Sequence, residues 1–504
     1  MPYARFVDTN EQKLEQIKTT HIDRSQVRLT VLDLEALIEA DHPARTIWDL
    51  CGQLDLKAFE SECKTKEGRA GRPCWPARLL VSVWVYSYTL GVASARAIER
   101  MMAHEPGLRW LSGDEAVNHH SLSDFRVGHE KALEELFAQF LAMLESAGAI
   151  DLKTILHDGT KMKAVAGGSS FHRRKTLQQR LRQARKVVKE LDRRAAEAGE
   201  GVDERRQAAQ QRAAREKLQR AQAALQRLKE LEAKAGPKEI GTFRVSDSEP
   251  DACKMKHADG GHAPSYNMQV STEGQLKVIV GIGVTTDAND LRQLEPALER
   301  IQKNTGKLPD QMLTDTGYAT RKNVEYSSQQ NVKLIAPWKD NESREAGACK
   351  RNGIGAEFGG SHFRRPGGGG KLICPAGKTL VVITHKKHHG VLRQVFEARA
   401  ADCARCRYRT ACCGERGGPR RVERVVESVA MKQFLARMKN KATRAIYKKR
   451  CEIAEYPHLW MKAIRGWRRF SVRGVVKAGM EATWMALAYN VTQWMRLKRV
   501  QAAA

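Results

Sequence analysis

The sequence predicts a mixed α/β fold with a helical N-terminal region, and three observations carry that prediction. Residues 1–150 place apolar residues at helical spacing, most clearly from Pro76 to Met102. From residue 151 the pattern changes to short apolar runs and amphipathic segments in the order strand, hairpin, helix, strand, helix, strand. Two segments of different composition, 172–236 and 341–425, interrupt this order, so we interpret both as insertions.

Length and composition limit the classes to which this protein can belong. The chain has 504 residues, enough for two to four domains, and carries 87 Lys and Arg against 58 Asp and Glu, a formal charge of +29. That excess favours a polyanionic partner such as double-stranded DNA, although a merely soluble basic protein is the alternative. The most apolar stretch, from Leu79, is shorter than the roughly 20 residues of a membrane helix, so we expect a buried helix and no membrane. Eleven mostly unpatterned cysteines and a polar N-terminus without an export signal fit the cytoplasm.

Residues 1–150 are expected to form a compact helical unit that binds DNA or mediates dimerisation. Within it, "HSLSDFR" at His120–Arg126 resembles a helix cap whose helix continues through "ALEELFAQFLAML". The polar stretch 172–236 predicts an antiparallel pair of helices around a turn at Gly199–Gly201. A solvated basic hairpin that supports structure or tracks DNA is one interpretation of this pair, and an oligomerisation coil is the other. Its inward positions recur at spacings of three and four: Leu177, Leu181, Ala184, Val188 and Leu191 on one arm, and Ala214, Leu218, Ala221, Leu225 and Leu228 on the other.

The later segments alternate between strand and helix patterns. "YNMQVST" and "QLKVIVGIGV" predict a hairpin around Glu273-Gly274, "QMLTD" and "VKLIAP" predict strands, and "DLRQLEPALERIQKN" and "TRKNVEYSSQQ" predict helices. Asn267 and Gln269 would share one face of their strand, which either approaches the site or is ordinary edge polarity. From Ala430 onward the chain is expected to be helical to its end.

Two aspartates share one context. Asp158 and Asp315 each close a short apolar strand, with a glycine following at once or one residue later. Carboxylates at adjacent strand ends can meet and hold two divalent metal ions, as in phosphoryl-transfer sites, whereas a single aspartate before glycine is often only a turn former. Asp287 and Asp290 compete for the second position, but they precede a helix and are expected to cap it.

A third acid is expected in the C-terminal region, where Glu452, Glu455 and Glu481 are candidates. Glu455 has phosphate-binding groups around it in sequence, and Pro457 is expected to kink or restart the helix beyond it. Those groups are Tyr447, Arg450 and Lys462.

These residues, in this order, resemble a known family, the DDE transposases of bacterial insertion sequences. The closest branch has a helical N-terminal domain and a cysteine-bearing insert before the glutamate. The resemblance covers nearly the whole chain and is weakest at residues 1–40 and 172–235. The motifs that carry it are "LHDGTK", "YNMQ", "LTDTGYAT", "RCEIAEYPHLWMK", "GWRRFSVRG" and "MALAYN".

The resemblance implies an RNase H-like catalytic domain formed by residues 151–340 and 426–504, with Mg²⁺ or Mn²⁺ as cofactor. Matched to the family's motifs, Asp158, Asp315 and Glu455 are the catalytic acids and the metal ligands. Tyr447, Arg450 and Lys462 match the family's tyrosine, arginine, glutamate, lysine signature and are implied contacts to transposon-end DNA. Four residues separate Arg450 from Glu455 where the signature has three, which leaves Glu452 as an alternative, while the six residues before Lys462 fit.

The implied activity is metal-dependent cleavage of DNA at transposon ends followed by strand transfer into target DNA. The resemblance also implies that the protein acts as a homodimer on DNA. Its implied location is the cytoplasm, in association with the nucleoid. A metal-dependent nuclease of the same fold without strand transfer, or an inactive DNA-binding protein, is the alternative.

The second insertion, 341–425, contains a cysteine group. Cys374, Cys403, Cys406 and Cys412 are the preferred ligands of a structural Zn²⁺ ion, with His385, His388 or His389 as a replacement for one of them. Free reduced thiols are the other interpretation. Trp460 and Trp467, together with the nearby arginines, are expected either to stack on unpaired bases or to pack into the core.

Overall fold

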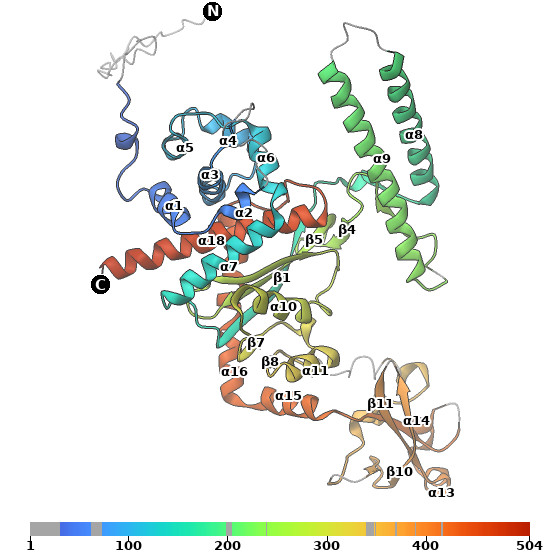
Figure 1. Ribbon diagram of the computed structural model, residues 1–504. Coiled ribbons are helices and arrows are strands. Elements are labelled where there is room, and N and C mark those ends of the chain that lie inside the picture. The colour runs from blue at the N-terminus through green and yellow to red at the C-terminus, as the bar shows by residue number, and fades with distance from the viewer. Residues whose placement is uncertain are drawn as a thin grey trace, which may run out of the picture.

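The computed structural model describes residues 31–504 except 62–72, 198–203, 238, 339–346, 348, 368–369, 389, 415–416 and 504. Figure 1 shows four parts: N-terminal helices, a central sheet with helices around it, a projecting helical hairpin, and a small second sheet. No helix of the described residues is long and apolar enough to cross a membrane.

Seven α-helices follow one another through the described residues of the N-terminal region. Helix α3 is buried at every position except Arg78, so the apolar stretch from Leu79 is a buried helix as predicted. The expected continuous helix after His120 is wrong, because Asn118 caps α6 and the non-helical backbone of His129 separates α6 from α7. The helices are α1 (Pro43–Gly52), α2 (Lys57–Glu60), α3 (Ala77–Thr89), α4 (Ala95–Met101), α5 (Pro106–Ser112), α6 (His119–Gly128) and α7 (Glu130–Ser146).

The central sheet combines antiparallel and parallel strands. Strand β5 pairs antiparallel with β4, β6 and β1, and β1 then pairs parallel with β7, which pairs parallel with β8. The predicted hairpin around Glu273-Gly274 is confirmed. The strands are β1 (Thr154–Lys163), β4 (Cys253–Lys256), β5 (His262–Glu273), β6 (Ile279–Thr285), β7 (Gln311–Leu313) and β8 (Lys333–Ile335).

Strand β1 is longer than predicted. The glycine after Asp158 does not end it, because β1 stays in register with β5 from Ile155, opposite Glu273, to Lys163, opposite Ser265. Asp158 therefore lies in mid-strand, and the expectation that it closes the strand is wrong.

Helices cover both faces of this sheet. On one face Ile155 packs in the main core with side chains of α10 (Leu294–Thr305), and on the other Leu156 packs with Ala454 of α17 (Arg450–Leu459). Successive strand residues point to opposite faces, so β1 supplies both cores. Helix α11 (Arg321–Gln329) packs beside β8.

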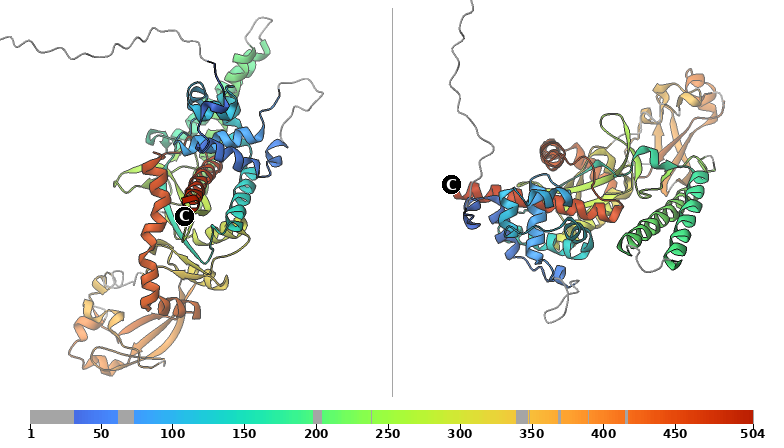
Figure 2. Two further views of the ribbon diagram at one scale, coloured as in Figure 1. Left: turned by 90° about the vertical axis from the view of Figure 1, so that its left-hand side faces the viewer. Right: turned by 90° about the horizontal axis from the view of Figure 1, so that it is seen from above.

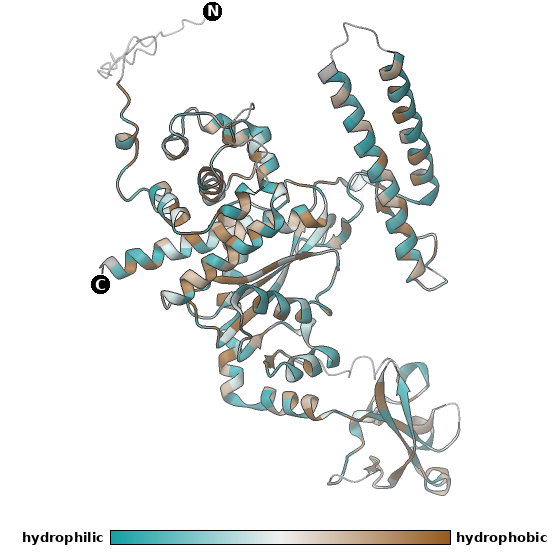
Figure 3. Ribbon diagram, viewed as in Figure 1, coloured by the Kyte–Doolittle hydropathy of each residue, from teal (hydrophilic) through white to brown (hydrophobic). Residues whose placement is uncertain are grey.

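A helical hairpin follows β1 in the sequence. Helices α8 (Arg174–Glu197) and α9 (Glu204–Ala233) lie side by side and project from the sheet, with mostly hydrophilic surfaces (Figures 1 and 3). All ten predicted inward positions are buried or half-buried. The predicted turn at Gly199–Gly201 lies outside the described residues. Short strands β2 (Phe171–His172) and β3 (Val245–Ser246) pair at the base of the hairpin.

Residues 341–425, for which no elements were predicted, contain a second sheet with its own small core. That core includes Phe363, Leu380 and Phe396. The strands are β9 (Lys371–Ile373), β10 (Thr379–His388), β11 (Val391–Ala398) and β12 (Arg421–Val425), with short helices α13 (Ala400–Ala404) and α14 (Arg409–Cys413).

The C-terminal region is helical but interrupted, which corrects the prediction of helix to the end. Residues 465–474 are not helical, and here Phe470 N donates to the carbonyl of Lys163 beyond Asp158 on β1. Trp460 and Trp467 are 3% and 5% exposed and pack edge to face, so of the two interpretations the structure confirms core packing and not base stacking.

The remaining helices are α15 (Val429–Lys439), α16 (Lys441–Lys448), α17, a π-helical turn η6 (Trp460–Ile464) and α18 (Val475–Ala503). Helix α18 packs against β6 and against α3 and α7, and so joins the sheet to the N-terminal helices (Figure 2).

Candidate active site

Asp158 and Asp315 lie close together because of the register of two parallel strands. Leu156 of β1 is opposite Leu313 of β7, and each aspartate lies two residues further along its strand direction. Asp315 Oδ1 accepts the backbone N–H of Gly317 at 2.7 Å, which fixes the turn after β7. Burial raises the pKa of Asp158, and the negative charge of Asp315 adds to that rise. The two predicted acids are therefore neighbours, one in the middle of β1 and the other just beyond the end of β7.

Arg450 contacts the first of these acids. Its Nη2 lies 3.1 Å from Asp158 Oδ1, and its side chain is only 8% exposed. Burial raises the pKa of Asp158 from 3.8 to about 6; Arg450 opposes this rise, while Asp315 and Asp290 add to it. One arginine therefore does not offset the cost of placing the Asp158 charge here, and an additional cation would favour the ionised form.

The other two residues of the predicted signature also lie beside β1. Lys462, in the π-helical turn, donates its ammonium group to Thr160 Oγ1 and to the carbonyl of Lys161. Burial lowers the pKa of Lys462 to about 8. Tyr447 is half-buried, and its side chain packs in the cluster around Leu156.

Glu455 is the predicted acid that the structure does not bring to the other two. It is exposed on α17, between Arg450 and Lys462 in the sequence, whereas Lys462 lies in the π-helical turn that follows and contacts β1. Pro457 lies inside α17, so the helix does not restart there. Among the described residues, no group of three or more His, Cys, Asp or Glu side chains is placed to hold a metal ion.

The alternative glutamates are engaged elsewhere. Glu452 is exposed and lies 3.6 Å from Lys277 Nζ. Glu481 is buried and accepts hydrogen bonds from the backbone N–H and hydroxyl of Ser471. Glu481 therefore contributes to the core.

Asp290 was misassigned from the sequence. Helix α10 begins at Leu294 with Gln293 as its N-cap, so Asp290 does not cap it. Instead, Asp290 Oδ1 accepts hydrogen bonds from Asn267 Nδ2 at 2.7 Å and from Gln269 Nε2 at 2.8 Å. Asn267 and Gln269 thus face the site, and the signal for this was their alternation on the strand beside β1.

A buried polar network lies beneath the acids. His157 is fully buried, and its ring nitrogens contact Ser271 Oγ and Gln269 Oε1, both at 2.9 Å. Burial lowers the pKa of His157 to about 3, so the ring is neutral. Tyr318 donates its hydroxyl to Gln269 Oε1, and burial raises its pKa. The network fixes the side chain of Gln269, which in turn holds Asp290.

The predicted zinc ligands gather without forming a metal-binding group. Cys374, Cys403, Cys406 and Cys412 line one cavity of about 30 Å³, and Cys413 lines it with them. All five are free thiols, and burial raises the pKa of Cys412 to about 12. The zinc site stays a prediction beside the interpretation as reduced thiols.

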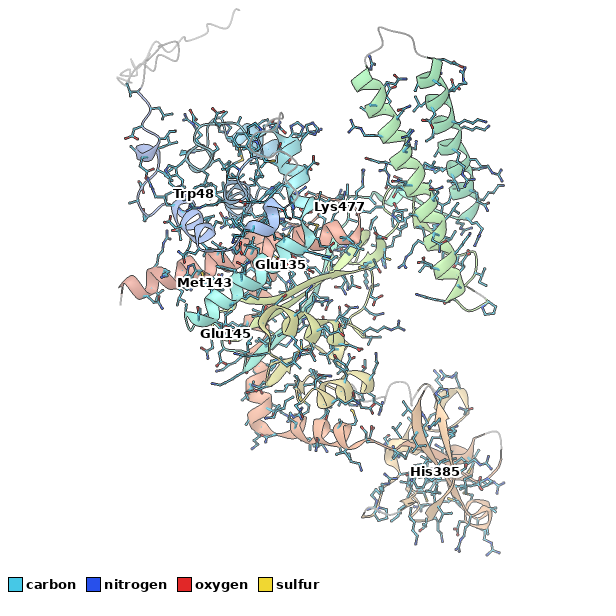
Figure 4. All side chains as sticks on the ribbon, in the orientation of Figure 1. Trp48, Glu135, Met143, Glu145, His385 and Lys477 are labelled. Carbon is cyan, nitrogen blue, oxygen red and sulfur yellow. The ribbon has the colours of Figure 1, made fainter. Side chains whose placement is uncertain are left out.

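The two described histidine alternatives, His385 and His388, do not line that cavity. His385 is exposed and lies in the second sheet (Figure 4). Its Nε2 is 3.3 Å from Gln394 Nε2. His388 is also exposed, and His389 lies outside the described residues.

Both ends of this arrangement match known transposase domains. Residues 32–128, which hold α1 to α6, match the Transposase domain (DUF772), and residues 373–495 match the Transposase DDE domain. Together the two matches indicate an insertion-sequence DDE transposase. The second match contains Glu455 and its basic neighbours, whereas Asp158 and Asp315 lie outside both. No curated protein matches the chain, and no solved structure does.

Proposed function

We propose that this transposase cuts DNA at transposon ends and joins the freed ends to target DNA, with Asp158, Asp315 and Glu455 as ligands of Mg²⁺ or Mn²⁺. The observation that carries the proposal is the placement of Asp158 on β1 beside Asp315, which lies just beyond the end of the neighbouring parallel strand β7, with Arg450 and Lys462 near Asp158. The mixed sheet, covered by helices on both faces, supports an RNase H-like catalytic domain.

The donor set fits the proposed ions. Carboxylate oxygens are the ligands that Mg²⁺ prefers, and burial around Asp158 makes a bound cation favourable. Two bound divalent ions would supply stabilisation of the entering and leaving oxygens in an in-line displacement. Glu455 completes the ligand set by approaching from α17, whose adjoining π-helical turn is a type of element frequent at functional sites.

The basic residues have separate tasks in this proposal. Arg450 offsets part of the cost of the Asp158 charge in the free protein, and in this proposal its guanidinium group also contacts a DNA phosphate. Lys462 holds its ammonium group against β1 two residues beyond Asp158, so it orients the phosphate next to the one that is cut. Tyr447 contributes its hydroxyl beside them. The net charge of +29 provides the general attraction to DNA.

The other parts of the chain support this chemistry. We assign DNA binding and dimerisation to the helical unit 1–150, because transposon ends must be paired before transfer. The α8–α9 hairpin, an insertion at 172–236, has a solvated basic surface suited to the flanking duplex. The insertion at 341–425 is stiffened by the cysteine group.

An assay on DNA tests the proposal. Wild-type protein and Asp158→Asn are incubated with the element's own ends and a target plasmid, with Mg²⁺, Mn²⁺ or EDTA. We expect cut and joined products with wild type plus metal, and neither with Asp158→Asn. Cut ends without joined products would favour a nuclease, and equal behaviour of the two proteins would favour a DNA-binding protein in which the acids are structural.

A further inference from the structure

Asp290 is a loop residue whose side chain is held by hydrogen bonds from the central sheet. It lies between β6 and α10, and its Oδ1 accepts hydrogen bonds from two amides of β5, those of Asn267 and Gln269. In the strand register Asn267 is opposite Lys161 and Gln269 is opposite Gly159, so both amides lie beside the part of β1 that carries Asp158. Strand β5 thus holds the Asp290 carboxylate beside the part of β1 that carries Asp158.

Two glycines show how near Asp290 is to both predicted acids. A Cβ atom added at Gly159, the residue after Asp158, would lie 2.6 Å from Asp290 Oδ1. A Cβ atom added at Gly317, two residues after Asp315, would lie 3.7 Å from Asp290 Cβ. Asp290 therefore lies between the two chain segments that carry the predicted metal ligands.

The oxygens around Asp290 have capacity left for a ligand. Within the described part of the chain, both amide donors bond to Oδ1, and no hydrogen bond reaches Oδ2. Asn267 is fully buried, yet its side-chain oxygen has no hydrogen-bond partner among the described residues. A buried amide oxygen without a partner costs free energy, and a bound cation would satisfy it.

A purely structural role explains these contacts less well. The same loop is already anchored by Asp287, which is exposed and accepts a hydrogen bond from Gln293 Nε2 at 2.9 Å. A third carboxylate beside Asp158 and Asp315 adds repulsion that a neutral side chain would avoid. A divalent cation bound between the three carboxylates would offset that repulsion.

We propose that Asp290 is a fourth acidic residue of the active site and a ligand of a divalent cation of the Mg²⁺ and Mn²⁺ class. Asn267 and Gln269 position its carboxylate. The inference rests on the proposed function, because it places Asp290 at the same metal site. It predicts that the free protein binds a cation between Asp158, Asp290 and Asp315 before Glu455 approaches. The three side chains are not placed to hold an ion in the described structure, so they must move closer together when one binds.

Mn²⁺ binding without DNA tests this role. The full-length protein and its variants are titrated with Mn²⁺ and followed by electron paramagnetic resonance at pH 7.5. We expect Asp290→Asn to weaken Mn²⁺ binding by about 10- to 100-fold, Asp290→Glu to recover part of it, and the matched loop control Asp287→Asn to bind as wild type does. Circular dichroism and thermal unfolding check that each variant is folded, and Asp290→Ser replaces Asp290→Asn if the latter is not.

The outcomes separate this inference from the proposed function. Wild-type affinity in Asp290→Asn, together with lost affinity in Asp158→Asn, would overturn the role of Asp290 and leave the site intact. No Mn²⁺ binding by wild type, with DNA cleavage unaffected in Asp158→Asn, would overturn both. Equal losses in Asp290→Asn and Asp287→Asn would show a loop effect and would also overturn the ligand role.

Discussion

Asp158 is ionised at neutral pH in a place where burial opposes its charge, so Asp158→Asn should stabilise the metal-free protein. The pKa of Asp158 rises from 3.8 to about 6. Two pKa units at about 1.4 kcal/mol each give an upper limit of about 3 kcal/mol in the free energy of unfolding. The side chain is 22% exposed and the contact with Arg450 is weakened in the variant, so we expect about 1–3 kcal/mol.

The stabilisation should depend on pH with a definite sign. Because the folded-state pKa of Asp158 is raised, its favourable contribution to wild type is complete below about pH 4 and is lost as pH rises through about 6. The difference between Asp158→Asn and wild type should therefore be small near pH 4 and reach its full size by pH 7.5.

Urea denaturation in EDTA at several pH values measures this difference, with Asp287→Asn as a control at an exposed position. Adding Mn²⁺ at pH 7.5 should stabilise wild type and leave Asp158→Asn unchanged. An Asp158→Asn protein that is less stable than wild type by the same amount at every pH would refute the reasoning.

Three further predictions concern packing, DNA and zinc. Gly159→Ala should lower stability by about 1–3 kcal/mol in thermal unfolding, because the new methyl group would lie 2.4 Å from Gln269 Nε2; Gly168→Ala, with open space around it, should change little. Lys462→Ala should weaken binding of end DNA and reduce its salt dependence in a fluorescence titration, and Lys462→Arg should retain most of both. Purified protein should release about one zinc ion per chain on treatment with a mercurial, and Cys403→Ser should contain less; metal-free wild type would support the reduced thiols instead.

Pattern and motif context could predict the two aspartates, because each follows a short apolar run of sequence and is followed by a glycine. The length of β1 could not be predicted in the same way. Glycine after Asp158 normally indicates a turn, but here it lies opposite Gln269, where a side chain would collide with the neighbouring strand and with Asp290. The need for that glycine is a tertiary effect.

Asp290 shows the limit of reasoning from local sequence. Its position shortly before a helix predicted a cap, but its partners, Asn267 and Gln269, lie more than twenty residues earlier on another strand. The break between α6 and α7 is a smaller example, because the apolar pattern continues across His129 while its backbone leaves the helix. The second sheet had no clear alternation in the sequence, since much of β10 is exposed.

Metal-dependent cleavage by the two neighbouring glutamate variants tests the central claim most directly. Glu455→Gln and Glu452→Gln are compared with wild type on the element's own end DNA in Mg²⁺, with binding of the same DNA measured in parallel. The account predicts that Glu455→Gln binds DNA but loses detectable cleavage, whereas Glu452→Gln, whose residue is exposed and pairs with Lys277, cleaves as wild type does. Full cleavage by Glu455→Gln would contradict the assignment of the third acid.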